Sequence, residues 1–278
     1  LVGFDNWSIP FFIISGTGLV LALLYVFAFD PGRGRTEPEL AKVYASGKEY
    51  RHHIRTSDIL GLASRKTNIW LIAQGFTAQF AYGSLVWVPI LIQAKVQAQG
   101  YSLETAVQVG TLFAIIFQTG ALFSIFSGQL GDMWARRDPR GRAYISAIGI
   151  VSAIPFFLVL FFLPLNGLSV PESGGILQLL PAVLASFFSN IWVVTAFVLS
   201  LAALALTSAD SPNWFALISD VNPPENRGTI FGIASLSNGT GRSVGNWLAS
   251  VVFTYLKSSG MYKSPWNYAI GLALFQVF

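Results

Sequence analysis

The chain has 278 residues, of which 53% are hydrophobic and 11% are charged, and because soluble domains carry about 25% charged residues, this composition excludes a soluble fold. The formal net charge of +4 comes from basic residues in polar segments beside apolar runs, which indicates anionic lipid headgroups rather than nucleic acid as the charged partner. The absence of cysteine excludes a disulfide framework, a zinc–thiolate site and a thiol nucleophile.

Six apolar runs are long enough to cross a bilayer, because about 20 apolar residues span its ~30 Å hydrocarbon core. The first covers residues 7–29 and is followed by a polar segment at residues 30–67. A last run, residues 266–278, is too short to cross and is interpreted as a truncated helix. Since the chain begins with Leu1 rather than Met, we expect a piece of a longer protein. The five runs between are expected at Asn68–Gln93, Thr105–Ser127, Ala143–Pro164, Asn190–Leu217 and Thr229–Leu256.

A short polar loop follows the third of these six runs and reads GQLGDMWARR from Gly128 to Arg137. It combines small residues, one acidic residue at a helix end and a basic cluster. This loop resembles the signature loop of the major facilitator superfamily, which reads roughly G-x-L-x-D-R-x-G-R-R. Met133 and Ala135 depart from that pattern. The matching residues are Gly128, Leu130, Asp132, Arg136 and Arg137.

The resemblance implies an all-α integral membrane fold of twelve helices, in two six-helix halves joined by a cytoplasmic linker. Aligned on the signature loop, residues 1–29 are the last helix of the N-terminal half, residues 30–67 are the linker, and residues 68–278 are the C-terminal half with its last helix truncated. The fold is therefore expected to be a helix bundle of this type, a fragment with six full spans and a truncated seventh. The missing N-terminal half is then a partner.

The signature loop also predicts a gate. Asp132 ends a helix at its negative pole, where a carboxylate is disfavoured. We therefore expect it to face the positive N-terminus of a helix in the other half and so close the inner gate. Arg227 belongs to a second match, the turn DVNPPENRG, which resembles the family's acidic-Pro-Arg-Gly turn. The expected gating residues are Gly128, Asp132, Arg136, Arg137 and Arg227.

The stretch from Ser173 to Ala209 has no charge, and it is too long for one helix and too short for two with a turn. Pro181 predicts an interfacial or re-entrant lead-in, so that the span starts near Asn190. The next residue, Asp210, is the only acid expected inside a span. It either carries a coupling proton or pairs with an arginine, unless the span ends earlier and leaves it at the interface.

The sixth run carries four polar residues on one helical face, because they are spaced at i, i+3, i+7 and i+11: Ser235, Asn238, Arg242 and Asn246. An arginine inside a span costs about 2.5–3.5 kcal/mol on insertion scales, so it should not face lipid. Arg242 is either a structural ion pair, for which Asp210 is offset by roughly 9 Å along the membrane normal, or a cavity residue that binds an anionic group. We favour the cavity. Gly241 and Gly245 form a small-xxx-small pair that permits close helix contact.

Two amides in other spans, Gln74 and Gln118, either line the same cavity or bridge neighbouring helices. The basic residues predict the orientation: 13 of the 17 lie on the side of the 30–67 segment, which is therefore cytoplasmic. The chain is then a multi-pass protein of the cytoplasmic membrane.

These features favour a secondary transporter that moves a small solute by alternating access, with proton coupling as one option. The alternative is a transport-dead, transporter-like sensor or an integral-membrane enzyme. No nucleophile–base pair and no P-loop occur in the sequence, so we expect neither an enzyme nor an ATP-driven pump. No catalytic residue, metal or cofactor is expected. Arg242 indicates an anionic or amphipathic solute.

Overall fold

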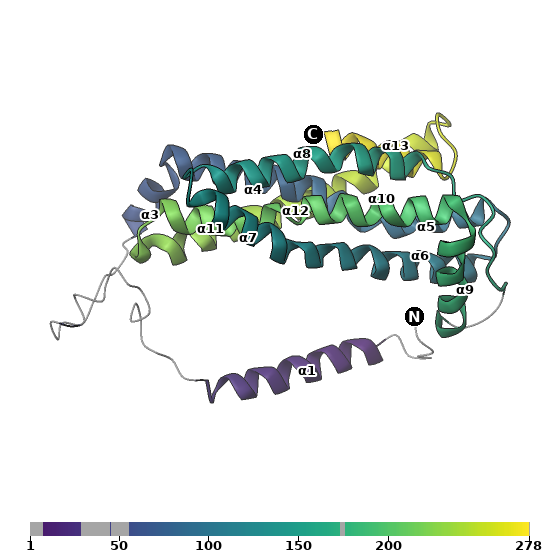
Figure 1. The fold of residues 1–278 in the computed structure, drawn as a ribbon, viewed down its shortest axis with the longest axis horizontal. Coiled ribbons are helices and arrows are strands. Elements are labelled where there is room, and N and C mark those ends of the chain that lie inside the picture. Colours follow the sequence, from purple (N-terminus) through teal and green to yellow (C-terminus); the bar gives the residue numbers. More distant parts are fainter. Residues whose placement is uncertain (1–7, 29–44, 46–55, 173–175, 278) are drawn as a thin grey trace. The chain divides into compact units, whose positions relative to one another are not determined.

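The computed structural model describes residues 8–28, 45, 56–172 and 176–277 (Figure 1). The part of the chain that it describes contains helices and turns but no strand. It forms two compact units, residues 1–55 and residues 56–278, which are described separately. Most of the polar segment expected at residues 30–67 lies outside the described residues.

In the first unit, α1 (Ile9–Tyr25) is a charge-free helix of 17 residues with a proline in its first turn. Proline is accepted at this position because the first N–H groups of a helix have no partner within it. The helix lies inside the run expected at residues 7–29, whose two end residues are outside the described part.

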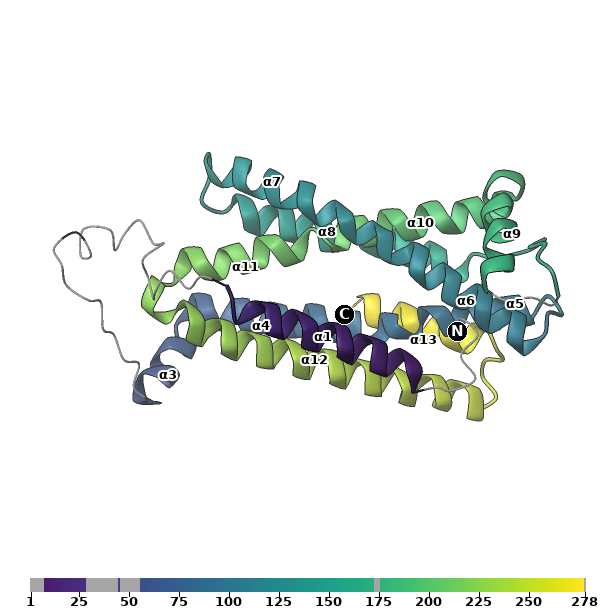
Figure 2. The same cartoon turned by 90° about the horizontal axis from the view of Figure 1, so that it is seen from below.

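In the second unit, most helices run along one direction, and α9 stands across the end of the bundle (Figures 1 and 2). The elements in chain order are α3 (Thr56–Ala63), α4 (Lys66–Ser84), η2 (Leu85–Trp87), α5 (Val88–Gln97), α6 (Leu103–Gln118), η3 (Thr119–Phe123), α7 (Ser124–Ala135), α8 (Gly141–Phe162), α9 (Ile176–Ser189), α10 (Ile191–Thr207), α11 (Asp210–Val221), α12 (Pro224–Ser258) and α13 (Trp266–Val277).

Four stretches of this unit are long and apolar enough to cross a membrane: Lys66–Gln97, Leu103–Ala135, Gly141–Phe162 and Ile191–Val221. They match four of the expected runs. The helix α12 is longer still, with 35 residues, but it is more polar. The helix α13 has 12 residues.

Three of the four spans are interrupted near their middle. Turns of 3₁₀ helix, η2 and η3, interrupt the first two, and a short non-helical step between Thr207 and Asp210 interrupts the fourth. Two of the breaks have a covalent cause, because Pro89 and Pro212 follow them and proline cannot donate to the preceding turn. At the third, η3 passes so close to α10 that a Cβ on Gly120 would lie 2.9 Å from the Leu204 Cβ. A break in a span leaves backbone polar groups without helical partners. At membrane depth such backbone is tolerated only where it lines a water-filled cavity or is buried in protein.

The uncharged stretch forms two helices with a sharp boundary at Asn190. The side-chain oxygen of Asn190 accepts from the Trp192 N–H at 2.9 Å and so caps the start of α10. The prediction that the span starts here is confirmed. Pro181 lies inside the short helix α9, which leads into this span, and the expectation that the stretch is too short for two helices with a turn was wrong, because a single residue, Asn190, separates α9 from α10.

The closest packing in the unit joins α4 and α12. Two glycines make this close approach possible. A Cβ atom on Gly241 would lie 2.5 Å from the Phe76 carbonyl oxygen, and a Cβ atom on Gly245 would collide with the Phe80 carbonyl oxygen. The close contact predicted from the small-xxx-small pair is thus present. Because Gly83 of α4 meets the backbone of Arg242, this arginine lies level with the middle of the span Lys66–Gln97.

At the end of the bundle that holds α9, four side chains grip the loop between α8 and α9, and we call them the loop clasp. The Lys95 ammonium donates to the Leu160 and Leu163 carbonyls. The remaining three members also bond to backbone groups of this loop: Gln99 to Leu168, Tyr101 to Leu168 and Val170, and Thr105 to Glu172.

Candidate functional site

A polar cavity of about 230 Å³ lies among α4, α10, α11 and α12. Its wall carries opposite charges, one carboxylate and one guanidinium, together with amide and hydroxyl groups. Water or a polar solute can satisfy such groups, whereas lipid cannot. The polar and charged residues in its lining are Gln79, Tyr82, Thr207, Ser208, Asp210, Ser211, Asn238 and Arg242.

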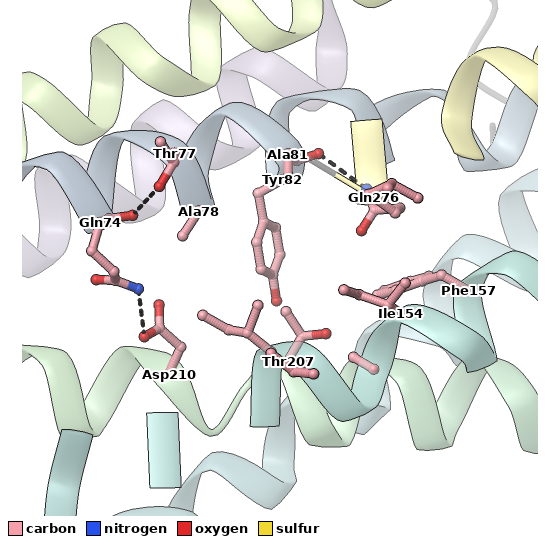
Figure 3. A pocket seen from close by; sticks show the side chains of 14 residues that line it. Gln74, Thr77, Ala78, Ala81, Tyr82, Ile154, Phe157, Thr207, Asp210 and Gln276 are labelled. Carbon is pink, nitrogen blue, oxygen red and sulfur yellow. Dashed lines mark hydrogen bonds between the residues drawn. The ribbon is translucent and has the colours of Figure 1, made fainter. Parts of the chain in front are cut away.

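A second cavity of about 270 Å³ shares part of this wall (Figure 3). Most of its lining is apolar and comes from α4 and α8, including Ala78, Ile154 and Phe157, and α13 adds Gln276. The residues common to both cavities are Tyr82, Thr207 and Asp210. The two cavities, which we call the polar cavity and the apolar cavity, therefore adjoin across these three side chains.

Asp210 begins α11, at the break in its span. Its carboxylate accepts a hydrogen bond of 3.1 Å from the Gln74 amide, as Figure 3 shows, and one from the Ser146 hydroxyl. A carboxylate in the first turn of a helix is also stabilised by the positive end of the helix dipole. Because the span continues to Val221, Asp210 lies inside it and not at its interfacial end. Of the two positions considered from the sequence, inside the span or at the interface, the structure shows the first.

Arg242 lines the polar cavity together with Asp210, yet the two residues form no ion pair. The ion pair considered from the sequence is therefore absent, because the bonds to Asp210 come from the neutral groups of Gln74 and Ser146. Arg242 is exposed, and its guanidinium donates to no residue in the described part of the chain. A cation at mid-span depth without an internal partner is costly in lipid.

Of the two predicted amides that line a cavity, Asn238 lines the polar cavity and Gln74 the apolar cavity. With its amide turned to donate, the Asn238 nitrogen lies 3.2 Å from the Gly75 carbonyl and 3.3 Å from that of Ala234. The Gln74 amide donates to Asp210, whereas its own oxygen is buried without a partner. A buried acceptor of this kind costs about 1–3 kcal/mol unless it is satisfied. A donor on a bound solute would satisfy it.

Three predicted cavity residues lie elsewhere. Ser235 is exposed and lines neither cavity, and Asn246 accepts from the Trp87 indole at 2.8 Å instead. Gln118 is exposed as well and lines neither cavity. Gln118 does not reach them because α6 packs mainly on α5, α9 and α10, and of these helices only α10 lines the two cavities, through its last residue, Thr207.

The signature loop packs closely against α11. A Cβ on Gly131 would collide with the Asn213 side chain, and Gly128 lies against Pro212. Asn213 donates in turn to the Ser127 carbonyl at 3.2 Å. Glycine is needed here because the two helices approach within a side chain's width, which gives the small residues of the loop a packing role.

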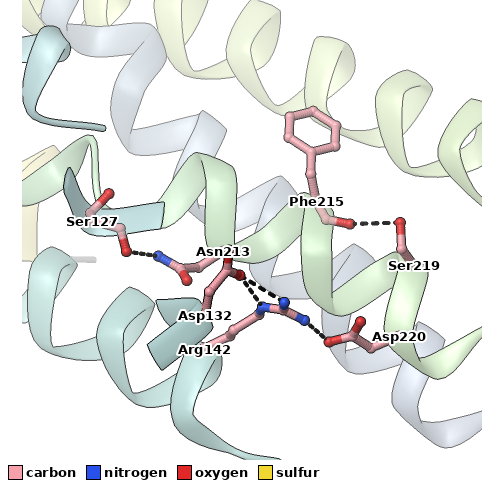
Figure 4. Close-up of polar contacts among 7 residues, drawn as sticks. All are labelled: Ser127, Asp132, Arg142, Asn213, Phe215, Ser219 and Asp220. Atoms are coloured by element: carbon pink, nitrogen blue, oxygen red, sulfur yellow. Dashed lines mark hydrogen bonds and ion pairs between the residues drawn. The ribbon is translucent and has the colours of Figure 1, made fainter. Parts of the chain in front are cut away.

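Figure 4 shows that Arg142 lies between two carboxylates. It donates to Asp132 at 2.8 Å from the end of α7 and also to Asp220 near the end of α11. We call these three residues the charge bridge. The expected partner of Asp132 is a helix in the other half, which the chain does not include, whereas within this chain the carboxylate pairs with Arg142, ten residues further on.

The other predicted gating residues do not join the charge bridge. Arg136 and Arg137 are exposed in the loop. Arg227 donates to the Ser219 and Asn222 carbonyls and so caps the end of α11. Arg227 thus acts as a helix cap, because basic side chains near a helix C-terminus can bond the last carbonyls, which lack helical partners.

Sequence reasoning missed three residues of this region. Arg142 was counted among the loop charges, although its position at the first turn of α8 separates it from them. Ser146 lies one turn further on, and a hydroxyl in so apolar a helix is a signal that was overlooked. Gln276 was not identified because it follows an apolar run near the chain's end. In the structure its amide donates to the Ala81 carbonyl at 3.3 Å.

Comparison with known proteins yields one match. A family model described as Major Facilitator Superfamily matches residues 1–170, which is more than half of the chain. The match includes α4, the signature loop and the start of the charge bridge, but it ends before Asp210 and Arg242. Neither a search among curated proteins nor one among solved structures found a match.

Proposed function

We propose, since this chain belongs to the major facilitator superfamily of membrane transporters, that it forms part of a secondary transporter that moves a small solute by alternating access. In this proposal residues 1–29 are the last helix of the N-terminal half, residues 30–67 are the cytoplasmic linker, and residues 68–278 are the C-terminal half with its last helix truncated. The joined polar and apolar cavities are this half's share of the solute site. We propose transport and not catalysis, in the cytoplasmic membrane.

One observation carries the proposal: Arg242, level with the middle of a span, lines a cavity with a carboxylate but has no hydrogen-bond partner in the described chain. An unpaired guanidinium at this depth requires either water or an anionic partner. Its planar fork binds carboxylate and phosphate groups through two parallel bonds. A solute with an anionic group supplies that partner during transport.

The two cavities support a solute with an apolar part as well. The polar cavity would hold the anionic group near Arg242 and Asn238, while the apolar cavity beside Ile154 and Phe157 would take a hydrocarbon or aromatic part. Tyr82, Thr207 and Asp210 stand between the two. We therefore propose a small amphipathic anion as the solute class.

We further propose that Asp210 carries a coupling proton. Its carboxylate is bonded by the neutral groups of Gln74 and Ser146 and is not paired with Arg242, so gain of a proton breaks no ion pair. Binding of an anion at Arg242 would bring a second negative charge close to Asp210. Protonation of Asp210 relieves that repulsion, which links solute binding to proton binding.

The test is uptake by proteoliposomes that contain the full-length protein, with an imposed pH gradient and a panel of radiolabelled small amphipathic anions. Saturable uptake that an uncoupler abolishes is expected for the wild-type protein. Arg242→Ala should abolish it, and Arg242→Lys should restore little, because a point charge does not replace the planar fork. Arg140→Ala is the matched control, since Arg140 is an exposed loop arginine away from both cavities.

Asp210→Asn separates coupling from binding. It should keep solute exchange down a concentration gradient but lose the response to the pH gradient. Normal, pH-driven uptake by well-folded Arg242→Ala protein would refute the solute site. Retention of pH-driven uptake by Asp210→Asn would refute the coupling role alone.

A further inference from the structure

Lys95 is a buried cation that the proposed solute site does not use. It lies in the last turn of α5, with 8% of its surface exposed. Its ammonium donates to the Leu160 carbonyl at 3.0 Å and to that of Leu163 at 2.7 Å. The Leu160 carbonyl lacks its usual helical partner because residue 164 is proline, which has no N–H. Lys95 therefore caps the end of α8.

This capping role leaves part of the ammonium unused. An ammonium group has three N–H donors, and the two carbonyls take two of them. In the described part of the chain no carboxylate pairs with Lys95. The negative end of the α8 dipole compensates only about half a charge. A buried charge is costly unless it is fully paired, so the site favours an anion.

Beside this ammonium is a cavity of about 200 Å³, which we call the Lys95 cavity. Gln99 also lines it, and the Gln99 amide nitrogen makes only one long bond, 3.5 Å, to the Lys95 carbonyl. One cationic donor and one amide donor thus face a space that is otherwise mainly apolar. The remaining lining comes from Ala98, Phe161, Phe162, Leu163, Pro164, Leu165, Asn166, Pro265, Trp266 and Ala269.

The depth of the Lys95 cavity is that of lipid headgroups. Lys95 is two residues from the end of the span Lys66–Gln97, and Phe162 is the last residue of the span Gly141–Phe162. The Phe162 and Trp266 rings stack with centroids 6.4 Å apart, and 41% and 50% of their surfaces are exposed. Tryptophan is enriched at this level of the membrane. The exposed rings offer an apolar shelf for hydrocarbon chains.

We propose that the Lys95 cavity binds the phosphate group of a membrane phospholipid, with Lys95 as its cation and the acyl chains against Phe162 and Trp266. Lysine binds phosphate as a point charge, which needs one free donor and no second cation. The apolar shelf favours a lipid over free phosphate. This site lies outside both solute cavities and does not depend on the transport proposal.

The experiment measures the melting temperature of the purified full-length protein in detergent, followed by tryptophan fluorescence. The probe is dihexanoyl phosphatidylglycerol, added below its critical micelle concentration, with sodium chloride at equal ionic strength as the salt control. A ligand that binds only the folded state raises the melting temperature with the logarithm of its concentration once that concentration exceeds Kd. We expect that result for the wild-type protein and for Lys257→Met, an exposed lysine at the end of α12.

Two variants test the site. Lys95→Met keeps the length of the side chain but removes the charge, so the apparent affinity should fall about tenfold or more. Ala98→Leu leaves the bonds of Lys95 in place and narrows the cavity from an exposed lining position, and it should also weaken binding. If Lys95→Met does not fold, Ala98→Leu alone tests whether the Lys95 cavity binds the lipid. An unchanged response in Ala98→Leu, or in folded Lys95→Met, overturns the site.

Inorganic phosphate distinguishes the source of the phosphate group. If lipid is the ligand, inorganic phosphate at the same concentration should raise the melting temperature much less than dihexanoyl phosphatidylglycerol. An equal, Lys95-dependent rise with inorganic phosphate would overturn the assignment to phospholipid.

Discussion

At one end of the bundle, the loop clasp joins α5 and α6 to the loop after α8 through hydrogen bonds that run from side chains to backbone groups. At the other end, the charge bridge joins α7, α8 and α11 through charged side chains, and its carboxylates are half exposed, at 59% for Asp132 and 50% for Asp220. Exposed ion pairs contribute about 0–1 kcal/mol and are screened by salt. A buried backbone group that loses its partner costs about 1–3 kcal/mol.

This difference indicates which contacts of the second unit break most easily. A contact that is weak in water can break and form again, whereas loss of the loop clasp would leave buried backbone groups without partners. The charge bridge is not the only contact at its end, because Asn68 and Asn222 exchange two buried hydrogen bonds between α4 and α11. The charge bridge is therefore one of several contacts at its end, where α11 is also bonded to α7 through Asn213 and Ser127 and to α8 through Asp210 and Ser146.

The largest effect is expected in the labelling of single cysteines, which reports the side of the membrane on which each end of the bundle lies. Because the chain has no cysteine, single cysteines are labelled without background. Arg140→Cys, next to the charge bridge, should react only with a reagent that enters the cytoplasm, since basic loops stay inside. Lys263→Cys, at the end that holds the loop clasp, should react from outside. Labelling of both from one side would overturn the orientation.

The next effect is on stability. Tyr101→Phe removes the hydroxyl that donates to the Leu168 carbonyl at 2.5 Å and accepts from Val170. Two backbone groups then lose a partner, so the free energy of unfolding should fall by about 1–3 kcal/mol. The control is Tyr144→Phe near the charge bridge, whose hydroxyl makes no hydrogen bond with a described residue. Equal melting temperatures for the two variants would remove the contrast between the ends.

Much of this architecture could be predicted from the sequence, because length and apolarity determine which runs cross a membrane. The start of α10 follows from a single residue, Asn190. Of the mid-span breaks, the one beside Pro212 follows from the proline itself, whereas the breaks at η2 and η3 were not predicted, although Pro89 is a visible signal for the first. Both proline signals need only the rule that proline interrupts the turn before it.

The contacts within the candidate site were harder to predict. Periodicity places Ser235, Asn238 and Arg242 on one face, but the structure brings only Asn238 and Arg242 to the polar cavity and leaves Ser235 outside it. In an apolar helix, periodicity does not tell which face meets which neighbour. The partners of Asp210 and Asp132 were missed because both come from another helix, α8, which contributes Ser146 and Arg142. Such contacts depend on tertiary structure.

A smaller effect is expected in turnover. Asp132→Asn removes one carboxylate of the charge bridge and should leave the melting temperature nearly unchanged, because this carboxylate is 59% exposed. If the charge bridge forms in one conformation and breaks in another, its loss should slow uptake by about two- to fivefold, as for a contact of up to 1 kcal/mol. Initial uptake rates at saturating solute measure this. A large fall in stability with unchanged turnover would show that the contact is structural.

The smallest effect expected is that of salt on the wild-type protein. Between about 0.1 and 1 M ionic strength the Debye length falls from about 10 to 3 Å, so the pairs that Arg142 forms with exposed carboxylates weaken. Turnover should change by at most about twofold, and Asp132→Asn should reduce the change, because one pair has already been lost. The hydrogen bonds of the loop clasp are buried or part-buried and mostly neutral, so the melting temperature should respond equally in the wild-type protein and in Asp132→Asn. A salt response of turnover that is identical in both proteins would place its origin elsewhere in the molecule and leave the charge bridge with a purely structural part.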